Sequence, residues 1–184
     1  MKSKRASLTT SLKSQLLVLA SVAVVACGCS GVKPQRMVPK LDRQSQPNIG
    51  SLRVREVTGG KNAQFGGMET VNNEQFQKAL LMALEQSGLF SGVSTGSGDL
   101  ELYATIRAQD TKVSRGLQYT ATLVASYKIQ DPAGKVLWSE SFDSESSSVA
   151  FSGATRMVEA REGSVRENLA AFIKGLRERW PKQR

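Results

Sequence analysis

The stretch Asp99-Leu-Glu-Leu-Tyr-Ala-Thr-Ile-Arg-Ala-Gln109 alternates apolar and polar residues along its whole length. Successive side chains of a β-strand point to opposite faces, so this alternation predicts a strand with one buried and one wet face. The run Leu117–Gln130 alternates in the same way, and a tight turn at Asp131-Pro-Ala-Gly134 leads into a third run, Lys135–Phe142. Together these segments predict an antiparallel meander.

Two helices flank this meander in the sequence. Apolar residues recur at three- and four-residue steps from Phe76 to Ser87, after a capping residue at Asn72 or Asn73 and before a stop at Gly88. A second apolar stripe of the same period runs from about Ala154 to Trp180. Both periods are typical of helices that pack one face against a sheet.

The run Ile49–Val57 alternates less regularly and predicts a first strand. The order β-α-β-β-β-α then predicts an α+β fold, with an antiparallel sheet of about four strands and two helices packed on one face. The serine-rich segment Asp143–Ser152 either extends the last strand or forms an exposed edge loop. The expected core consists of Leu52, Val54, Phe76, Leu80, Leu84, Leu102, Ile106, Leu123, Tyr127, Trp138, Leu169, Phe172, Ile173 and Leu176.

The sequence ahead of this domain predicts export and lipid attachment. Basic residues precede an uncharged run from Leu16 to Ala26. The run is shorter than the about 20 apolar residues of a spanning helix, and it is typical of a secretory signal peptide. It ends in Val24-Val25-Ala26-Cys27, which resembles the lipobox of bacterial lipoproteins. The resemblance implies that residues 1–26 are removed and that the Cys27 sulfur carries a diacylglycerol.

Two alternatives to this interpretation stay open. The segment could be an ordinary secretory signal with two incidental cysteines, and Cys29 offers a second start site with a poorer fit to the lipobox. Lipidation would supply two or three acyl chains, which hold a protein stably at a membrane at about 0.8 kcal/mol per buried CH₂. In enterobacterial lipoproteins an Asp after the lipidated cysteine marks retention at the inner membrane, and here that residue is Gly28. We therefore expect an outer-membrane lipoprotein that faces the periplasm.

The domain organisation follows from these observations. We expect residues 1–26 to be the signal peptide, residues 27–48 the lipidated N-terminus and a flexible tether, and residues 49–184 a single periplasmic α+β domain. The tether prediction rests on three prolines, polar composition and the lack of any periodicity. The cations of this segment could contact an anionic membrane surface, or the segment could be a solvated linker.

The composition argues against several classes of function. The chain has no histidine, which removes His-based acid–base catalysis and most zinc sites. Ser30-Gly-Val-Lys33 has the Ser-x-x-Lys spacing of a serine nucleophile with a lysine base, but it stands in the predicted tether and lacks the accompanying motifs. We therefore expect no enzyme, no catalytic residue, no cofactor and no metal. Export also takes the chain away from nucleic acid.

Basic residues cluster at the end of the second helix: Lys174, Arg177, Arg179, Lys182 and Arg184. They could bind lipid headgroups or lipopolysaccharide phosphates. The dipole of a helix also favours cations at its C-terminus, so a solvated helix end is the simpler interpretation. Loss of the four signal-peptide cations lowers the formal net charge from +9 to +5, a moderate basic balance that permits anionic contacts without requiring them.

Four segments carry a further resemblance: Phe76–Phe90, Asp99–Ile106, Tyr127–Trp138 and Arg156–Leu169. They are similar to small periplasmic lipoproteins that assist envelope machines, namely the lipopolysaccharide-assembly lipoprotein, activators of penicillin-binding proteins and auxiliary lipoproteins of ABC transport systems. The resemblance implies an accessory or assembly factor that binds an envelope protein partner, and we expect the exposed edge at Asp143–Ser152 to carry the contact. The alternative is a lipid- or lipopolysaccharide-binding auxiliary component of an envelope transport system.

Overall fold

The structure is a computed structural model that describes residues 31–42, 49–60, 64–65, 68–113 and 118–180. The predicted signal peptide and the predicted lipid attachment site, Cys27, lie outside the described residues. Within the described part of the chain, no helix is long and apolar enough to cross a membrane.

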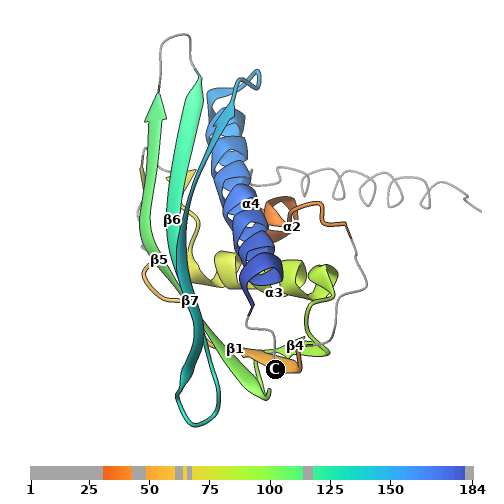
Figure 1. The fold of residues 1–184 in the computed structure, drawn as a ribbon. Helices are drawn as coiled ribbons and strands as arrows, with labels where there is room; N and C mark the ends of the chain where they lie inside the picture. The colour runs from red at the N-terminus through yellow and green to blue at the C-terminus, as the bar shows by residue number, and fades with distance from the viewer. Residues whose placement is uncertain (1–30, 43–48, 61–63, 66–67, 114–117, 181–184) are drawn as a thin grey trace, which may run out of the picture. The chain divides into compact units, whose positions relative to one another are not determined.

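Five strands form a mixed sheet in the order β4-β1-β5-β6-β7 (Figure 1). Strands β5, β6 and β7 form the predicted antiparallel meander. Strand β1, however, runs parallel to both of its neighbours, so the expectation of a purely antiparallel sheet of about four strands is wrong. The strands are β1 (Ser51–Val54), β4 (Gly92–Ser94), β5 (Leu100–Val113), β6 (Tyr119–Gln130) and β7 (Val136–Ser148).

The parallel pairing has a topological cause. Helix α3 (Asn73–Ser87) lies between β1 and β4 in the sequence, and such a crossover helix lets the two neighbouring strands run in the same direction. The chain then passes β1 again on its way from β4 to β5. At this crossing a Cβ atom on Gly98 would overlap the backbone of Leu52 and Arg53, so the close approach requires glycine. A separate two-stranded sheet pairs β2 (Gln64–Phe65) with β3 (Met68–Glu69).

Three helices accompany the sheet in the described residues, one more than the sequence predicts. Helix α3 starts with a capping box between Asn72 and Gln75 and ends at Gly88, whose φ of 65° suits the left-handed cap. Helix α4 (Gly153–Arg179) begins at the N-cap Ser152 and confirms the second predicted helix. The additional helix is α2 (Pro34–Met37), a single turn.

The core lies between the sheet and the helices α3 and α4 (Figure 1). Every residue predicted for the core is at most 6% exposed. Phe172 on α4 stacks on Tyr127 of β6 with ring centroids 4.0 Å apart, and Trp138 and Phe142 of β7 extend this aromatic cluster. The alternation seen in the sequence therefore identifies the buried face correctly.

The N-terminal segment 31–42 differs from its prediction as a flexible tether. It packs on α3 and α4 through α2, and it buries Val32 and Met37 at 5% and 0% exposure. Burial of the two apolar residues stabilises the packed segment, whereas a free tether would leave them in water. We call residues 31–42 the N-terminal strap.

The serine-rich segment continues strand β7. Pairing with β6 persists from Asp143, opposite Val124, to Ser148, opposite Tyr119. The structure thus supports the first of the two alternatives for this segment as far as Ser148. It makes β7 a long strand at the edge of the sheet.

Candidate functional site: a groove beside strand β7

Strand β7 forms one wall of a groove of about 950 Å³. Among the strands that the structure describes, β7 pairs only with β6, so its other edge is open. Helix α4 lies between β7 and the strap, which forms the opposite wall (Figure 1). The lining residues are Gln35, Arg36, Val38, Pro39 and Lys40 from the strap, Ser146, Ser147 and Ser148 from β7, and Glu159, Glu162, Arg166, Glu167 and Ala170 from α4.

Close packing of α4 on β7 sets the shape of the groove. A Cβ atom on Gly163 would overlap the side chain of Ser146, so glycine lets the helix approach the strand closely. The Ser144 hydroxyl donates to the Ser164 carbonyl at 2.8 Å. Two small residue types, glycine on the helix and serine on the strand, therefore bring the strand edge next to the helix surface.

Asn168 attaches helix α4 to strands β6 and β7 beside the groove. Its side-chain oxygen accepts a 2.6 Å hydrogen bond from the Tyr127 hydroxyl, and its amide nitrogen donates to the Phe142 carbonyl at 2.8 Å. Both Tyr127 and Asn168 are buried. Burial raises the pKa of Tyr127 well above its ordinary value, so this hydroxyl stays protonated and remains a donor.

Glu162 holds the strap against α4. Its side chain is 4% exposed, and it accepts a 2.7 Å hydrogen bond from the Lys33 backbone N–H. The Arg36 guanidinium lies 3.8 Å away. Burial raises the pKa of Glu162, while the Lys33 hydrogen bond and the charge of Arg36 act in the opposite direction.

The groove lining is polar and nearly balanced in formal charge. The lining combines three serines with three carboxylates and three cations, so it offers both donors and acceptors with little net charge. The Ser148 hydroxyl already donates to Glu159 at 2.6 Å. The open backbone edge of β7 adds the groups that pair with a further strand.

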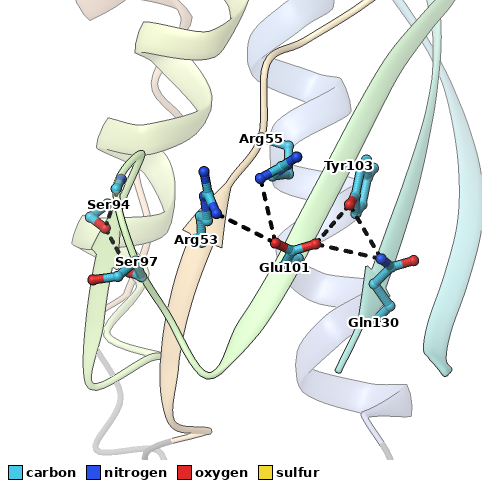
Figure 2. A network of polar contacts seen from close by, with 8 residues as sticks. Arg53, Arg55, Ser94, Ser97, Glu101, Tyr103 and Gln130 are labelled. Carbon is cyan, nitrogen blue, oxygen red and sulfur yellow. Dashed lines mark hydrogen bonds and ion pairs between the residues drawn. The ribbon is translucent and has the colours of Figure 1, made fainter. Parts of the chain in front are cut away.

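A second polar cluster lies on the sheet face that points away from the helices (Figure 2). Glu101 forms ion pairs with Arg53 and Arg55 at 3.7 and 3.5 Å and accepts a 2.7 Å hydrogen bond from the Tyr103 hydroxyl. Gln130 donates to that hydroxyl at 3.2 Å. The Tyr103 bond and the arginine charges lower the pKa of Glu101, and the same bond raises the pKa of Tyr103. These groups thus satisfy one another's hydrogen bonds and charges, with Glu101 as a charged carboxylate and Tyr103 as a neutral phenol.

The described members of the basic cluster predicted from the sequence, Lys174, Arg177 and Arg179, do not line the groove. Arg177 donates to the backbone carbonyls of Asp42 and Ser87, at 3.0 and 3.3 Å, and thereby fixes the end of the strap to α3. Its guanidinium is committed to contacts within the domain. Lys182 and Arg184 lie outside the described residues.

The two other basic residues of this cluster also have partners. Arg179 pairs with Glu140 at 2.9 Å and stands 5.9 Å from the ring centroid of Phe142. Lys174 lies 3.9 Å from Glu178, one turn along the exposed side of α4. The described cations of this cluster thus have partners within the domain, and their contact with anionic surfaces stays a prediction.

Sequence reasoning missed Glu162, Asn168 and the strap. A usable signal was present on α4, because both residues interrupt its apolar stripe: Glu162 lies between Val158 and Val165 at helical spacing. A polar residue on a buried stripe needs a partner, and here the partners come from the strap and from the sheet. The strap itself gives only the weak signal of proline at a helix start.

No protein-family model matches the chain, and no curated protein matches it either. Its fold is similar to that of XCC0632 from Xanthomonas campestris, described with the family DUF330, at a TM-score of 0.56. The identity is 15%, over 76% of this chain and 92% of that one. The minor lipoprotein of Acinetobacter baumannii gives a TM-score of 0.48 at 11% identity, over 75% and 99% of the two chains. The hypothetical protein CT253 of Chlamydia trachomatis gives 0.49 at 13%, over 68% and 96%.

The likeness to XCC0632 supports the fold, and the function has to be argued from the chain itself. The likeness to XCC0632 covers most of both chains and shows that the α+β arrangement of sheet and helices is shared. At 15% identity it transfers no role to a particular residue.

Proposed function

We propose that the chain is a lipoprotein anchored in the outer membrane and facing the periplasm, and that it acts without catalysis as an accessory or assembly factor. Its domain binds an extended segment of an envelope protein in the groove beside β7. The N-terminal sequence that resembles a lipobox, ending at Cys27, supports the anchor. The open edge of β7 within a groove is the single observation that carries the binding role.

The physical argument concerns backbone hydrogen bonds. The β7 edge lines the groove at Ser146, Ser147 and Ser148 and continues back to Phe142, roughly 23 Å in all at about 3.3 Å per residue, which is enough for a strand of ordinary length. Each new hydrogen bond contributes about 0.5–1.5 kcal/mol net. Natural edge strands are often protected by charged side chains or proline. Between Val136 and Ser148 there is no lysine or proline, and the three acids, Glu140, Asp143 and Glu145, do not line the groove. The opposite edge strand, β4, has only three residues.

Site-specific photo-crosslinking in membranes tests this proposal. A photoreactive residue at the exposed Ser147 lies at the β7 edge, beside the position of an added strand, and one at the exposed Gln86 on α3 provides a control outside the groove. We expect a crosslink to one envelope protein from position 147, its loss in the Cys27→Ala variant, and none from position 86. Equal labelling from both positions, or no labelling from a properly lipidated protein, would show that the groove is not the binding site.

A lipid- or lipopolysaccharide-binding role needs cations that are free to meet phosphates. Arg177 and Arg179 have partners within the domain, and Lys174, which is 75% exposed, lies outside the groove lining, so the groove itself favours the protein-binding role. Salt separates the two functions in the crosslinking assay. Contacts between cations and lipid phosphates weaken steeply with ionic strength, whereas pairing along a strand edge does not.

A further inference from the structure

The N-terminal strap is attached to the domain along its length. Val32 and Met37 are buried among core residues, and the Lys33 backbone N–H is bonded to the buried carboxylate of Glu162. Side chains from the two long helices hold three strap carbonyls: Gln75 that of Val32, Arg166 that of Arg36, and Arg177 that of Asp42. The chain is therefore attached to the domain from Val32 to Asp42.

This attachment limits how far the groove can lie from the lipid. Only six residue steps separate Cys27 from Lys33, and an extended chain covers at most about 22 Å over that length. Glu162 contacts Lys33 directly and also lines the groove. The groove wall at Glu162 is thus within about 25 Å of the lipidated residue, whereas a free tether as far as Asn48 would allow about 75 Å.

We propose that the groove binds the membrane-proximal extended segment of a protein embedded in the same membrane as the lipid anchor. This inference rests on the proposed function and specifies its partner. The short link between Cys27 and Lys33 holds the β7 edge close to the membrane surface, where the loops that flank membrane-embedded domains lie. Proteins further into the periplasm are out of its reach. The link also raises the effective concentration of the groove next to the membrane, where such a segment is found.

The chemistry of the groove fits a polar, extended segment of this kind. Ser147 and Glu167 are exposed at its rim, and Lys40 supplies a cation from the strap wall. A loop next to a membrane is rich in polar groups, which these side chains can pair, and its backbone can add to β7. The groove lining contains few apolar side chains, which disfavours a buried acyl chain as the occupant.

The decisive experiment lengthens the link and leaves the domain unchanged. Twenty Gly/Ser residues are inserted after Ser30, and crosslinking from position 147 is compared with that of the unmodified lipidated protein in membranes. The link between Cys27 and Gly31 grows from four residue steps to about 24, which lowers the effective concentration about 15-fold if it scales as the −3/2 power of length. We expect a drop of that size, with the crosslinked peptide adjoining a membrane-embedded part of the partner.

Three outcomes separate this inference from the proposed function. An unchanged yield in the lengthened variant, or capture of a soluble periplasmic protein, overturns the inference and leaves groove binding intact. Absence of any specific crosslink from position 147 overturns the proposed function.

A second measurement tests the distance without a partner. Lipidated protein carrying Glu167→Cys and Cys29→Ser is labelled with a donor dye and placed in phosphatidylethanolamine/phosphatidylglycerol vesicles with an acceptor on the headgroups. We expect energy transfer that falls when the 20-residue insertion is added. Equal transfer in both proteins would show that the strap does not hold the groove near the membrane.

Discussion

Replacing Asn168 with alanine should loosen the attachment of α4 to the sheet and so disturb the floor of the groove. The asparagine side chain accepts from the Tyr127 hydroxyl at 2.6 Å and donates to the Phe142 carbonyl at 2.8 Å. Alanine can do neither, and the hydroxyl that loses its acceptor is buried, since Tyr127 is 1% exposed.

The magnitude follows from the groups left without partners. A buried hydroxyl that loses its acceptor costs about 1–3 kcal/mol, and the Phe142 carbonyl loses a bond worth about 1 kcal/mol. We therefore expect Asn168→Ala to lower the free energy of unfolding by about 2–4 kcal/mol. For a domain of this size the melting temperature should fall by about 5–15 °C.

A double-mutant cycle distinguishes this cause from simple loss of volume. Tyr127→Phe removes the hydroxyl, so the double variant leaves no buried donor unpaired at this contact. The double variant should be about 1–2 kcal/mol more stable than the sum of the two single effects predicts. Chemical denaturation of the mature chain with Cys27→Ala measures all three variants, and the exposed helical Gln86→Ala serves as a control with an effect within about 0.5 kcal/mol. Additive effects, or an Asn168→Ala cost below about 0.5 kcal/mol, would refute the reasoning.

Three further predictions concern the walls of the groove. Gly163→Ala should destabilise the domain because the added Cβ meets Ser146. Overpacking costs about 1–3 kcal/mol, and the better helix propensity of alanine returns about 1 kcal/mol. Gly153→Ala, where a Cβ has ordinary contacts, should not destabilise the domain, and thermal melting of both variants measures the difference. Met37→Ala should cost about 2–5 kcal/mol where the strap stays packed, or release it, so hydrogen exchange of strap amides should accelerate more than that of α3. Burial raises the pKa of the Glu162 carboxyl, so the folded chain binds the carboxyl proton more tightly than the unfolded chain does. The free energy of unfolding of the wild type should therefore rise as the pH falls through the raised pKa toward the ordinary pKa of glutamate. Glu162→Gln should remove that part of the pH dependence, as denaturation at several pH values can show.

The long regular elements could be predicted because their periodicity extends over many residues. Strand β5 alternates from Leu100 to Ile106, β6 alternates over its 12 residues, and α4 repeats its apolar stripe along a helix of 27 residues, so the buried face is specified many times over. Strand β4 has three residues and α2 has four, too few to show either period. The parallel pairing of β1 depends on these short elements, which is why the sheet order could not be read from the pattern.

The candidate site was only half predictable for a related reason. The serine run of β7 was visible as a candidate edge, since its composition stands out in the sequence. The other wall depends on contacts more than 120 residues apart along the chain, between Lys33 and Glu162 and between Arg36 and Arg166. Such pairs leave no local pattern, apart from a polar residue on an apolar stripe.

The strap and the groove cannot vary independently, because Glu162 belongs to both. It accepts the Lys33 hydrogen bond that fixes the strap, and it lines the groove between α4 and the strap wall. Any segment that binds the groove more tightly when the strap is packed must also favour the packed strap, by the same factor in the equilibrium constant. Partner binding would thus strengthen the hold of the domain near its membrane anchor, and a strap released by substitution would weaken partner binding even though every residue of the β7 edge is unchanged.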